Sequence, residues 1–157
     1  MRRASMTVIG MCASVVVLAS GGLATAADSP VGTWVRVGDV PKAMGNMTMT
    51  IEKWGSSGCK LTYKIANPPV VLTLESKLDG SDAPLLANGQ PTGETFGLKR
   101  LDGHHATNVL KMNGKQFGTT TAAFNDDFSK LTIDDNVQDA TTMGPPRGKT
   151  TETWVRK

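Results

Sequence analysis

The chain has 157 residues, with 17 lysines and arginines against 14 acidic residues and a formal net charge of +3. The basic residues form no stripe and only 5% of the residues are aromatic, so the composition argues against nucleic-acid binding. The length favours a single domain with one hydrophobic core.

Residues 1–26 have the features of an export signal. Two arginines give a positive start, residues 8–18 are mostly apolar, and residues 24–26 read A-T-A, the small-residue pattern of a cleavage site. The apolar run is shorter than the ~20 residues that span a bilayer. We therefore expect cleavage after Ala26 or Ala27, export to the periplasm or the outside, and one domain over residues 27–157 without stable membrane insertion.

Removal of this signal takes away Cys12 and leaves Cys59 as the single cysteine. One thiol cannot form a disulfide within its own chain, so Cys59 is either buried and free or joined to another chain. Cys59 begins an alternating strand pattern, which favours burial. The domain is then expected to be stabilised by its core.

Alternation of apolar and polar residues predicts a series of strands along the rest of the chain, because side chains on a strand face opposite sides in turn. The predicted strands are residues 31–37, 47–52, 59–65, 70–78, 95–100, 107–112, 117–124, 130–134 and 149–156. No segment of ten or more residues after the signal has a clean helical pattern. The fold class is therefore predicted to be all-β.

Turn signals lie between these strands. Asp79-Gly80, Asp102-Gly103 and Asn113-Gly114 stand where tight hairpins need a positive φ, and Asn88-Gly89 marks another bend. Strands joined by short turns predict an antiparallel up-and-down barrel of about eight to ten strands, since closure removes the unpaired edges.

In such a barrel the first and last strands become neighbours. The string VGTWVRV at residues 31–37 and the string TETWVRK at residues 151–157 are nearly the same. We therefore expect these two strings to pair side by side where the barrel closes.

Several motifs, taken in order, resemble lipocalin-like (calycin) barrels. The stretch Gly32-Thr33-Trp34 is similar to the G-x-W signature of that group. The D-G-x-D-x-P element at residues 79–84 and the L-K-R-L-D segment at residues 98–102 resemble small exported bacterial members of unknown function. The resemblance implies that Trp34 closes the bottom of the barrel and that Arg156 packs across its indole.

A small barrel is either packed solid or leaves room for one ligand. The leading hypothesis is a non-catalytic exported barrel that binds a small hydrophobic molecule in its interior or mouth, without a cofactor. The candidate cavity lining comes from the alternating apolar faces: Met47, Met49, Ile51, Leu61, Tyr63, Ile65, Leu72 and Leu74.

Two other functions stay open. Met44, Met47 and Met49 have the spacing M-x-x-M-x-M, and thioethers are soft ligands that bind Cu(I). Copper binding in the periplasm is therefore an alternative, strengthened if Cys59 lies near them, although flexible packing in the core is the favoured explanation of these methionines. The third function is an envelope protein-interaction module that uses an exposed strand face or the Gly-Pro-Pro loop at residues 144–146.

No arrangement of residues points to catalysis. His104 and His105 are adjacent, so on a strand they face opposite sides and cannot easily hold one ion. The acidic pairs at residues 126–127 and 134–135 are both expected at turns, where carboxylates are usually solvated or cap the turn. Trp54 fits either the rim of the barrel or its core.

Overall fold

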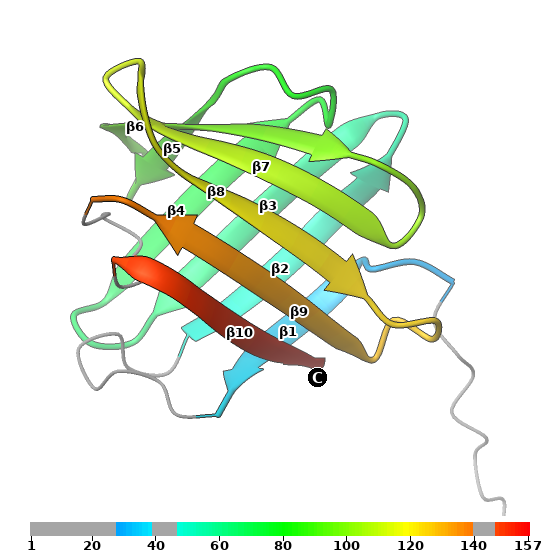
Figure 1. Cartoon of the computed structure of the whole chain (residues 1–157). Coiled ribbons are helices and arrows are strands. Elements are labelled where there is room, and N and C mark those ends of the chain that lie inside the picture. Colours follow the sequence, from blue (N-terminus) through cyan, green and yellow to red (C-terminus); the bar gives the residue numbers. More distant parts are fainter. Residues whose placement is uncertain (1–27, 39–46, 140–146) are drawn as a thin grey trace, which may run out of the picture.

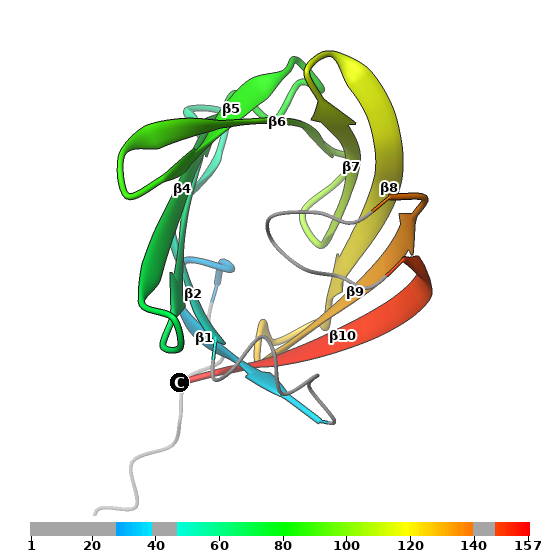
Figure 2. The same cartoon turned by 90° about the vertical axis from the view of Figure 1, so that its left-hand side faces the viewer.

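The computed structural model describes residues 28–38, 47–139 and 147–157, which form a closed antiparallel barrel of ten strands (Figure 1). The strands are β1 (Gly32–Val37), β2 (Met47–Gly55), β3 (Gly58–Ile65), β4 (Val70–Ser76), β5 (Ala83–Ala87), β6 (Gln90–Arg100), β7 (His105–Met112), β8 (Lys115–Phe124), β9 (Lys130–Val137) and β10 (Gly148–Arg156). Each strand pairs with its neighbours in the chain, and β1 pairs with β10 to complete the ring seen in Figure 2. The predicted up-and-down barrel is confirmed.

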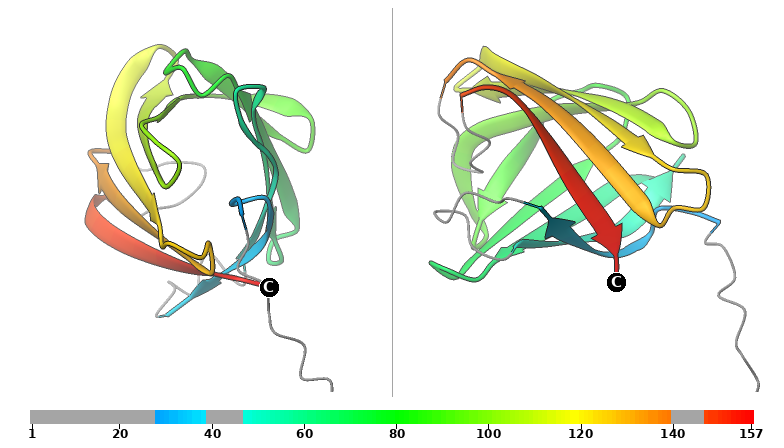
Figure 3. Two further views of the ribbon diagram at one scale, coloured as in Figure 1. Left: turned by 90° about the vertical axis from the view of Figure 1, so that its right-hand side faces the viewer. Right: turned by 60° about the horizontal axis from the view of Figure 1, so that its bottom comes forward.

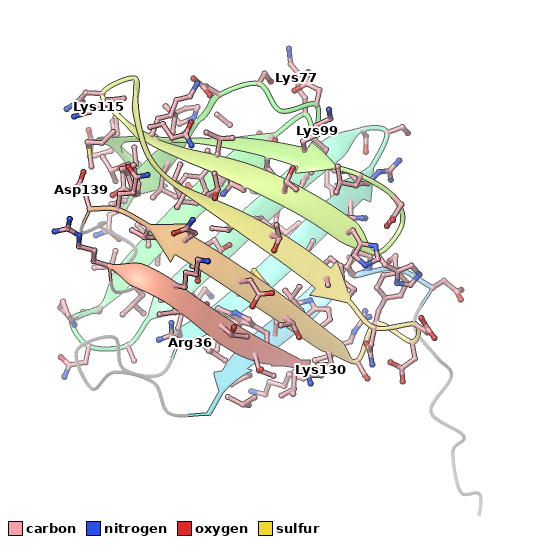
Figure 4. All side chains as sticks on the ribbon, in the orientation of Figure 1. Arg36, Lys77, Lys99, Lys115, Lys130 and Asp139 are labelled. Atoms are coloured by element: carbon pink, nitrogen blue, oxygen red, sulfur yellow. The ribbon has the colours of Figure 1, made fainter. Side chains whose placement is uncertain are left out.

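The two ends of the barrel differ. We call the end at which β2, β4, β6, β8 and β10 begin the open end, and the end at which they finish the closed end, because aromatic side chains fill the latter. Lys115 and Asp139 lie at the open end, at the left of Figure 4, whereas Lys77, Lys99 and Lys130 lie farther to the right. The carboxyl terminus lies at the closed end, below β1 and β10 (Figure 3).

Two of the predicted turns are tight hairpins of the expected kind. Asn113 and Gly114 have φ values of 50° and 82°, and Asn88 and Gly89 have φ values of 48° and 81°. Two successive positive φ values give the left-handed turn whose twist matches that of the strands it joins. Asp79-Gly80 differs, since it lies within the longer connection between β4 and β5.

The turn between β6 and β7 forms as predicted, but its expected positive φ is wrong. Neither Asp102 nor Gly103 has a positive φ. Instead, Asp102 Oδ1 accepts hydrogen bonds from the backbone N–H groups of His104 and His105, each at 2.7 Å. A side chain rather than a left-handed glycine therefore closes this turn.

Strand β5 has no counterpart among the predicted strands. It is 5 residues long and includes Pro84, which has no N–H to donate to a neighbouring strand. Its pairing with β6 shifts between Pro84 and Leu86. Such an irregular short strand lacks the alternation that marks the others, although Leu85 is 0% exposed.

Trp54 belongs to the interior because of a bulge in β2. The pairing of β2 with β3 shifts between Ile51 and Lys53, and the extra residue changes which side of the sheet the following side chains face. The Trp54 ring lies 5.4 Å from that of Phe124, edge on. Trp54 therefore packs at the closed end and is not a rim residue of the open end.

The repeated Trp-Val-Arg string forms a reciprocal pair where the barrel closes. In the β1–β10 register Trp34 lies opposite Arg156, and Arg36 lies opposite Trp154. The Arg156 guanidinium lies 5.9 Å from the Trp34 ring centre, and the Arg36 guanidinium lies 6.0 Å from that of Trp154. We call this arrangement the seam. Each strand thus supplies one aromatic face and one cation to the other.

Trp34 fills the closed end. It is 0% exposed, and its ring centre lies 5.4 Å from that of Phe124. Its indole Nε1 donates a hydrogen bond to the Pro30 carbonyl oxygen at 3.0 Å. Phe128 packs against Phe124 at 5.8 Å and completes the aromatic plug. The indole is thus held by a tilted aromatic contact with Phe124 on one side and by the hydrogen bond to Pro30 on the other.

Arg156 ties the last strand to the segment before the first. Its Nη1 donates to the Ser29 carbonyl oxygen at 2.9 Å, and its Nη2 donates to that of Val31. A Cβ atom on Gly32 would lie 3.0 Å from Nη2, and Gly32 has a φ of +150°. The glycine of the G-x-W string therefore makes room for the Arg156 guanidinium.

Replacing Arg156 by alanine is expected to lower the free energy of unfolding by about 2–4 kcal/mol, because it removes both the cation–π contact and the hydrogen bonds to carbonyl groups. Urea denaturation followed by tryptophan fluorescence measures this change. The control is Lys157→Ala, which removes an exposed charge next in the chain and should change the free energy by less than about 0.5 kcal/mol. Equal losses in both variants would contradict a special role for Arg156.

Candidate functional site inside the barrel

The barrel interior holds two small cavities. The upper cavity, about 80 Å³, lies toward the open end, and the lower cavity, about 60 Å³, lies toward the closed end. They adjoin, because both are lined by Tyr63, Phe96, Asn108, Thr120 and Ile133. The upper cavity is further lined by Arg36, Met47, Glu94, Leu110, Phe117, Asp135, Glu152 and Trp154. The interior is therefore neither packed solid nor as large as the ~300 Å³ of a typical drug-sized pocket.

The predicted cavity lining lies on the inner faces of β2, β3 and β4. Met47 lines the upper cavity, Tyr63 lines both, and the lower cavity is lined by Met49, Ile51, Leu61 and Leu74. Leu72 is 0% exposed and Ile65 is partly buried, but neither lines either of these two cavities. The opposite wall, from β6 to β10, was not part of the prediction. Ligand contact by these residues stays a prediction.

Four neighbouring strands place polar side chains at one level of the inner face. Asn108 on β7 pairs with Thr120 on β8, Thr120 pairs with Asp135 on β9, and Asp135 pairs with Thr150 on β10. We call these four residues the polar row. A row of this kind is unusual inside a small barrel, where inward positions are usually apolar.

Three oxygen atoms of the polar row lack hydrogen-bond partners among the described residues: Asn108 Oδ1, Asp135 Oδ2 and the hydroxyl Oγ1 of Thr150. Asn108 and Asp135 are 7% and 6% exposed and line the upper cavity, whereas Thr150 does not line it. A buried acceptor without a donor costs about 1–3 kcal/mol. A ligand that brings hydrogen-bond donors to this wall would recover that free energy.

The guanidinium beside the polar row is already paired. Arg36 Nη1 donates to Glu152 Oε1 at 2.9 Å, and the indole Nε1 of Trp154 donates to Glu152 Oε2 at 3.1 Å. The side chains of Arg36 and Glu152 are 4% and 17% exposed. Glu152 is thus held by two donors, and the Arg36 charge is balanced within the wall of the cavity.

Asp135 has an unusual protonation equilibrium. Its pKa is raised to about 7, first because burial disfavours the charged form and then because the charges of Glu152 and Asp134 are negative. Arg36 and the Thr150 hydroxyl act in the opposite direction but do not cancel this effect. The upper cavity therefore contains a carboxyl group that exchanges its proton near neutral pH.

An open depression of about 380 Å³ spans residues 119–121, 134–136 and 149–151 on three neighbouring strands. Successive residues on a strand face opposite sides of the sheet, so these segments do not direct all their polar groups toward one point. Asp134, Asn136 and Lys149 are exposed to solvent here. This surface is less suited to a specific ligand than the two cavities inside the barrel.

Two methionines of the copper hypothesis lie in the core of the barrel. Met47 and Met49 are 3% and 2% exposed inside the barrel, and Met44 lies outside the described residues. Met49 pairs with Tyr63, so Cys59 lies four residues away along β3, roughly 14 Å at the usual rise of a strand. Burial also raises the pKa of the Cys59 thiol to about 12, which keeps it protonated. This register gives Cys59 no part in a methionine site.

The two histidines lie at the surface of the closed end and separate from each other. The His104 ring stacks on Phe128 with a centroid distance of 4.5 Å, whereas His105 Nδ1 lies 2.9 Å from Asp102 Oδ2. Within the part of the chain that the structure describes, no three His, Cys, Asp or Glu side chains are grouped as metal ligands.

The acidic pair at residues 134–135 was misplaced by the sequence interpretation. It was assigned to a turn, but β9 continues to Val137, so Asp134 is exposed and Asp135 is buried. Asp135 shares its inward direction with Ile133 on the same strand. The alternation of inward and outward residues along β9 is the signal that could have identified Asp135. The same alternation places Asn108 on the inner face of β7, between Ala106 and Leu110. The pair at residues 126–127 does lie in a turn.

Comparisons with protein-family models, with curated proteins and with solved structures found no match. The predicted signal at residues 1–26 lies outside the described residues. In the described segments no helix is both long and apolar enough to cross a bilayer. Function must therefore be inferred from the barrel and from the chemistry of its interior.

The raised pKa of Asp135 predicts a pH-dependent difference between the wild type and an Asp135→Asn variant. The stability contributed by the protonated carboxyl is fully present below its unfolded-state pKa of about 4, and it is lost as the pH rises to about 7. The variant should therefore gain stability relative to the wild type over this range, with a limiting slope of about 1.4 kcal/mol per pH unit. Urea denaturation from pH 4 to pH 8 measures the difference.

The matched control for that experiment is Asp134→Asn, which changes the exposed neighbour on the same strand. Its stability relative to the wild type should vary much less with pH, because the exposed carboxylate is solvated. If both variants followed the wild type at every pH, Asp135 would not be titrating in a buried environment.

Proposed function

We propose that this protein is an exported, non-catalytic, lipocalin-like barrel that binds a small molecule in its upper cavity. The observation that carries the proposal is the lining of that cavity, where apolar and aromatic side chains face a few buried polar groups. Ligand sites in proteins commonly combine an apolar wall with a small number of polar groups that orient the ligand.

The expected ligand is smaller and more polar than a lipid. The upper cavity of about 80 Å³ and the adjoining lower cavity of about 60 Å³ together have room for a compound of roughly the size of a substituted benzene. Met47, Phe96 and Phe117 offer apolar contacts, whereas Asn108 and Asp135 offer hydrogen-bond acceptors. These contacts favour a ligand with an apolar body and a polar head over the purely hydrophobic one first expected.

The lipocalin-like assignment is supported by the first strand and the seam. The G-x-W string begins β1, Trp34 fills the closed end, and Arg156 lies over its indole. These contacts agree with what the resemblance implies for such barrels. Export is supported by the signal pattern of residues 1–26.

The two alternative functions have less support. A methionine copper site would have to use Met47 and Met49 without Cys59, and both thioethers are enclosed by the core. For a protein-interaction module, Leu101 is a large apolar side chain that is 58% exposed, and the Gly-Pro-Pro segment lies outside the described residues. Neither set of observations identifies a partner as directly as the cavity suggests a ligand.

The proposal predicts saturable binding of benzyl alcohol, a neutral probe with an aromatic body and one hydroxyl group. A dissociation constant of about 1 mM is expected for its eight non-hydrogen atoms at roughly 0.5 kcal/mol each. Two-dimensional NMR of the labelled protein should show shifts centred on Thr120, Ile133 and the indole N–H of Trp154, which line the upper cavity.

Two variants at neighbouring positions provide the control. Thr120→Phe places a ring into both cavities and should abolish the shifts, whereas Thr121→Phe changes an exposed residue and should leave them. Circular dichroism checks that each variant keeps its sheet. The proposed function fails if neither benzyl alcohol nor its charged analogues, benzylamine and benzoate, cause saturable shifts in the interior of the wild type.

A further inference from the structure

The polar row has a defined spacing that fits one small donor group. Asn108 and Asp135 are separated by a single strand, so their Cα atoms lie roughly 10 Å apart across the sheet. If the Asn108 and Asp135 side chains lean toward each other, a single ligand nitrogen at about 2.9 Å from an oxygen of each can bridge this distance. Thr120 lies between them and contributes a hydroxyl group.

The unpaired atoms of the row that line the upper cavity are both acceptors, which indicates that the ligand carries hydrogen-bond donors. Asn108 Oδ1 and Asp135 Oδ2 each need a hydrogen atom from a partner, and both side chains line the upper cavity. The guanidinium nearby does not offer a comparable site for an anion, because Arg36 is already paired with Glu152 at 2.9 Å. An acid would have to displace that carboxylate.

We propose that the upper cavity selects a small organic amine, whose ammonium group donates hydrogen bonds to Asp135 and Asn108. The apolar part of the amine contacts Phe96, Leu110 and Phe117, which line the same cavity. This assignment rests on the proposed function and names the chemical class of its ligand. An organic ammonium fits better than a metal ion, since no three suitable ligands are grouped in the described residues.

The charged groups around Asp135 agree with a cationic ligand. Glu152 on β10 and Asp134 on β9 are negative, Arg36 on β1 is positive, and Glu94 on β6 and Tyr63 on β3 line the same cavity. Burial is the largest cause that raises the pKa of Asp135 to about 7, and the negative charges of Glu152 and Asp134 add to it against the opposing effect of Arg36. A bound ammonium would favour the ionised carboxylate and release its proton.

The test compares benzylamine, benzyl alcohol and benzoate, which share one ring and differ in the charge of the head group. At pH 8 benzylamine should bind at least about tenfold more tightly than benzyl alcohol, since its donors are charged and Asp135 is ionised. In Asp135→Asn this preference should fall to within about threefold, whereas Asp134→Asn should keep it. NMR titration of the interior resonances measures all three affinities.

A second measurement uses the wild type alone, so it does not depend on the folding of any variant. Benzylamine affinity should fall about tenfold from pH 8 to pH 6, because Asp135 must lose its proton before it binds the cation. Calorimetry at pH 6 in two buffers of different ionisation enthalpy should show close to one proton released for each amine bound.

The outcomes separate the two proposals. Binding of benzyl alcohol without any preference for benzylamine would overturn the amine assignment and leave the ligand-binding function standing. Tightest binding by benzoate would also overturn it and would show that Arg36 exchanges Glu152 for a ligand carboxylate. If none of the three probes shifted the interior resonances, both proposals would be wrong.

Discussion

The reciprocal contact between two tryptophans and two arginines at the seam is the constraint on which the barrel depends. An up-and-down meander closes only if its first and last strands hold together, although they are the elements farthest apart in the chain. Here Trp34 meets Arg156 and Trp154 meets Arg36, so one repeated string is complementary to itself when the strands run antiparallel. A shift of register would place each tryptophan away from its arginine and would turn inward side chains toward solvent.

The same string has different consequences at the two ends of the seam. Near the closed end Arg156 binds the carbonyl groups of Ser29 and Val31, so its charge is satisfied by backbone and the indole beside it seals the barrel. Nearer the open end Arg36 has entered the interior and pairs with Glu152. The symmetry of the sequence therefore produces one packed end and one end with buried polar chemistry.

The sequence predicts the barrel well because alternation and turn residues are local signals. The strands at 59–65 and 117–124 and the hairpin at Asn113-Gly114 follow from such signals, and closure explains the repeated string. The predictions fail where the local sequence signal does not determine the structure. Pro84 and a register shift hide β5, and the Asp102 carboxylate closes a turn that seemed to require a left-handed glycine. The bulge that brings Trp54 inside depends on pairing with β3, which the sequence of β2 alone does not contain.

The site could be predicted only in part, because its apolar wall follows from alternation whereas its polar wall contradicts it. Adjacent acids usually indicate a turn, yet Asp135 continues a strand and faces inward, where its chemistry is set by residues from distant parts of the chain. The seam brings Arg36 into the barrel, Arg36 requires a carboxylate, and Glu152 supplies it from the paired strand. The negative charge of Glu152 then opposes ionisation of Asp135. The constraint that closes the barrel thus also contributes to the electrostatics of its cavity, where burial is the largest cause of the raised pKa of Asp135, and a cationic ligand would relieve the repulsion between Glu152 and Asp135.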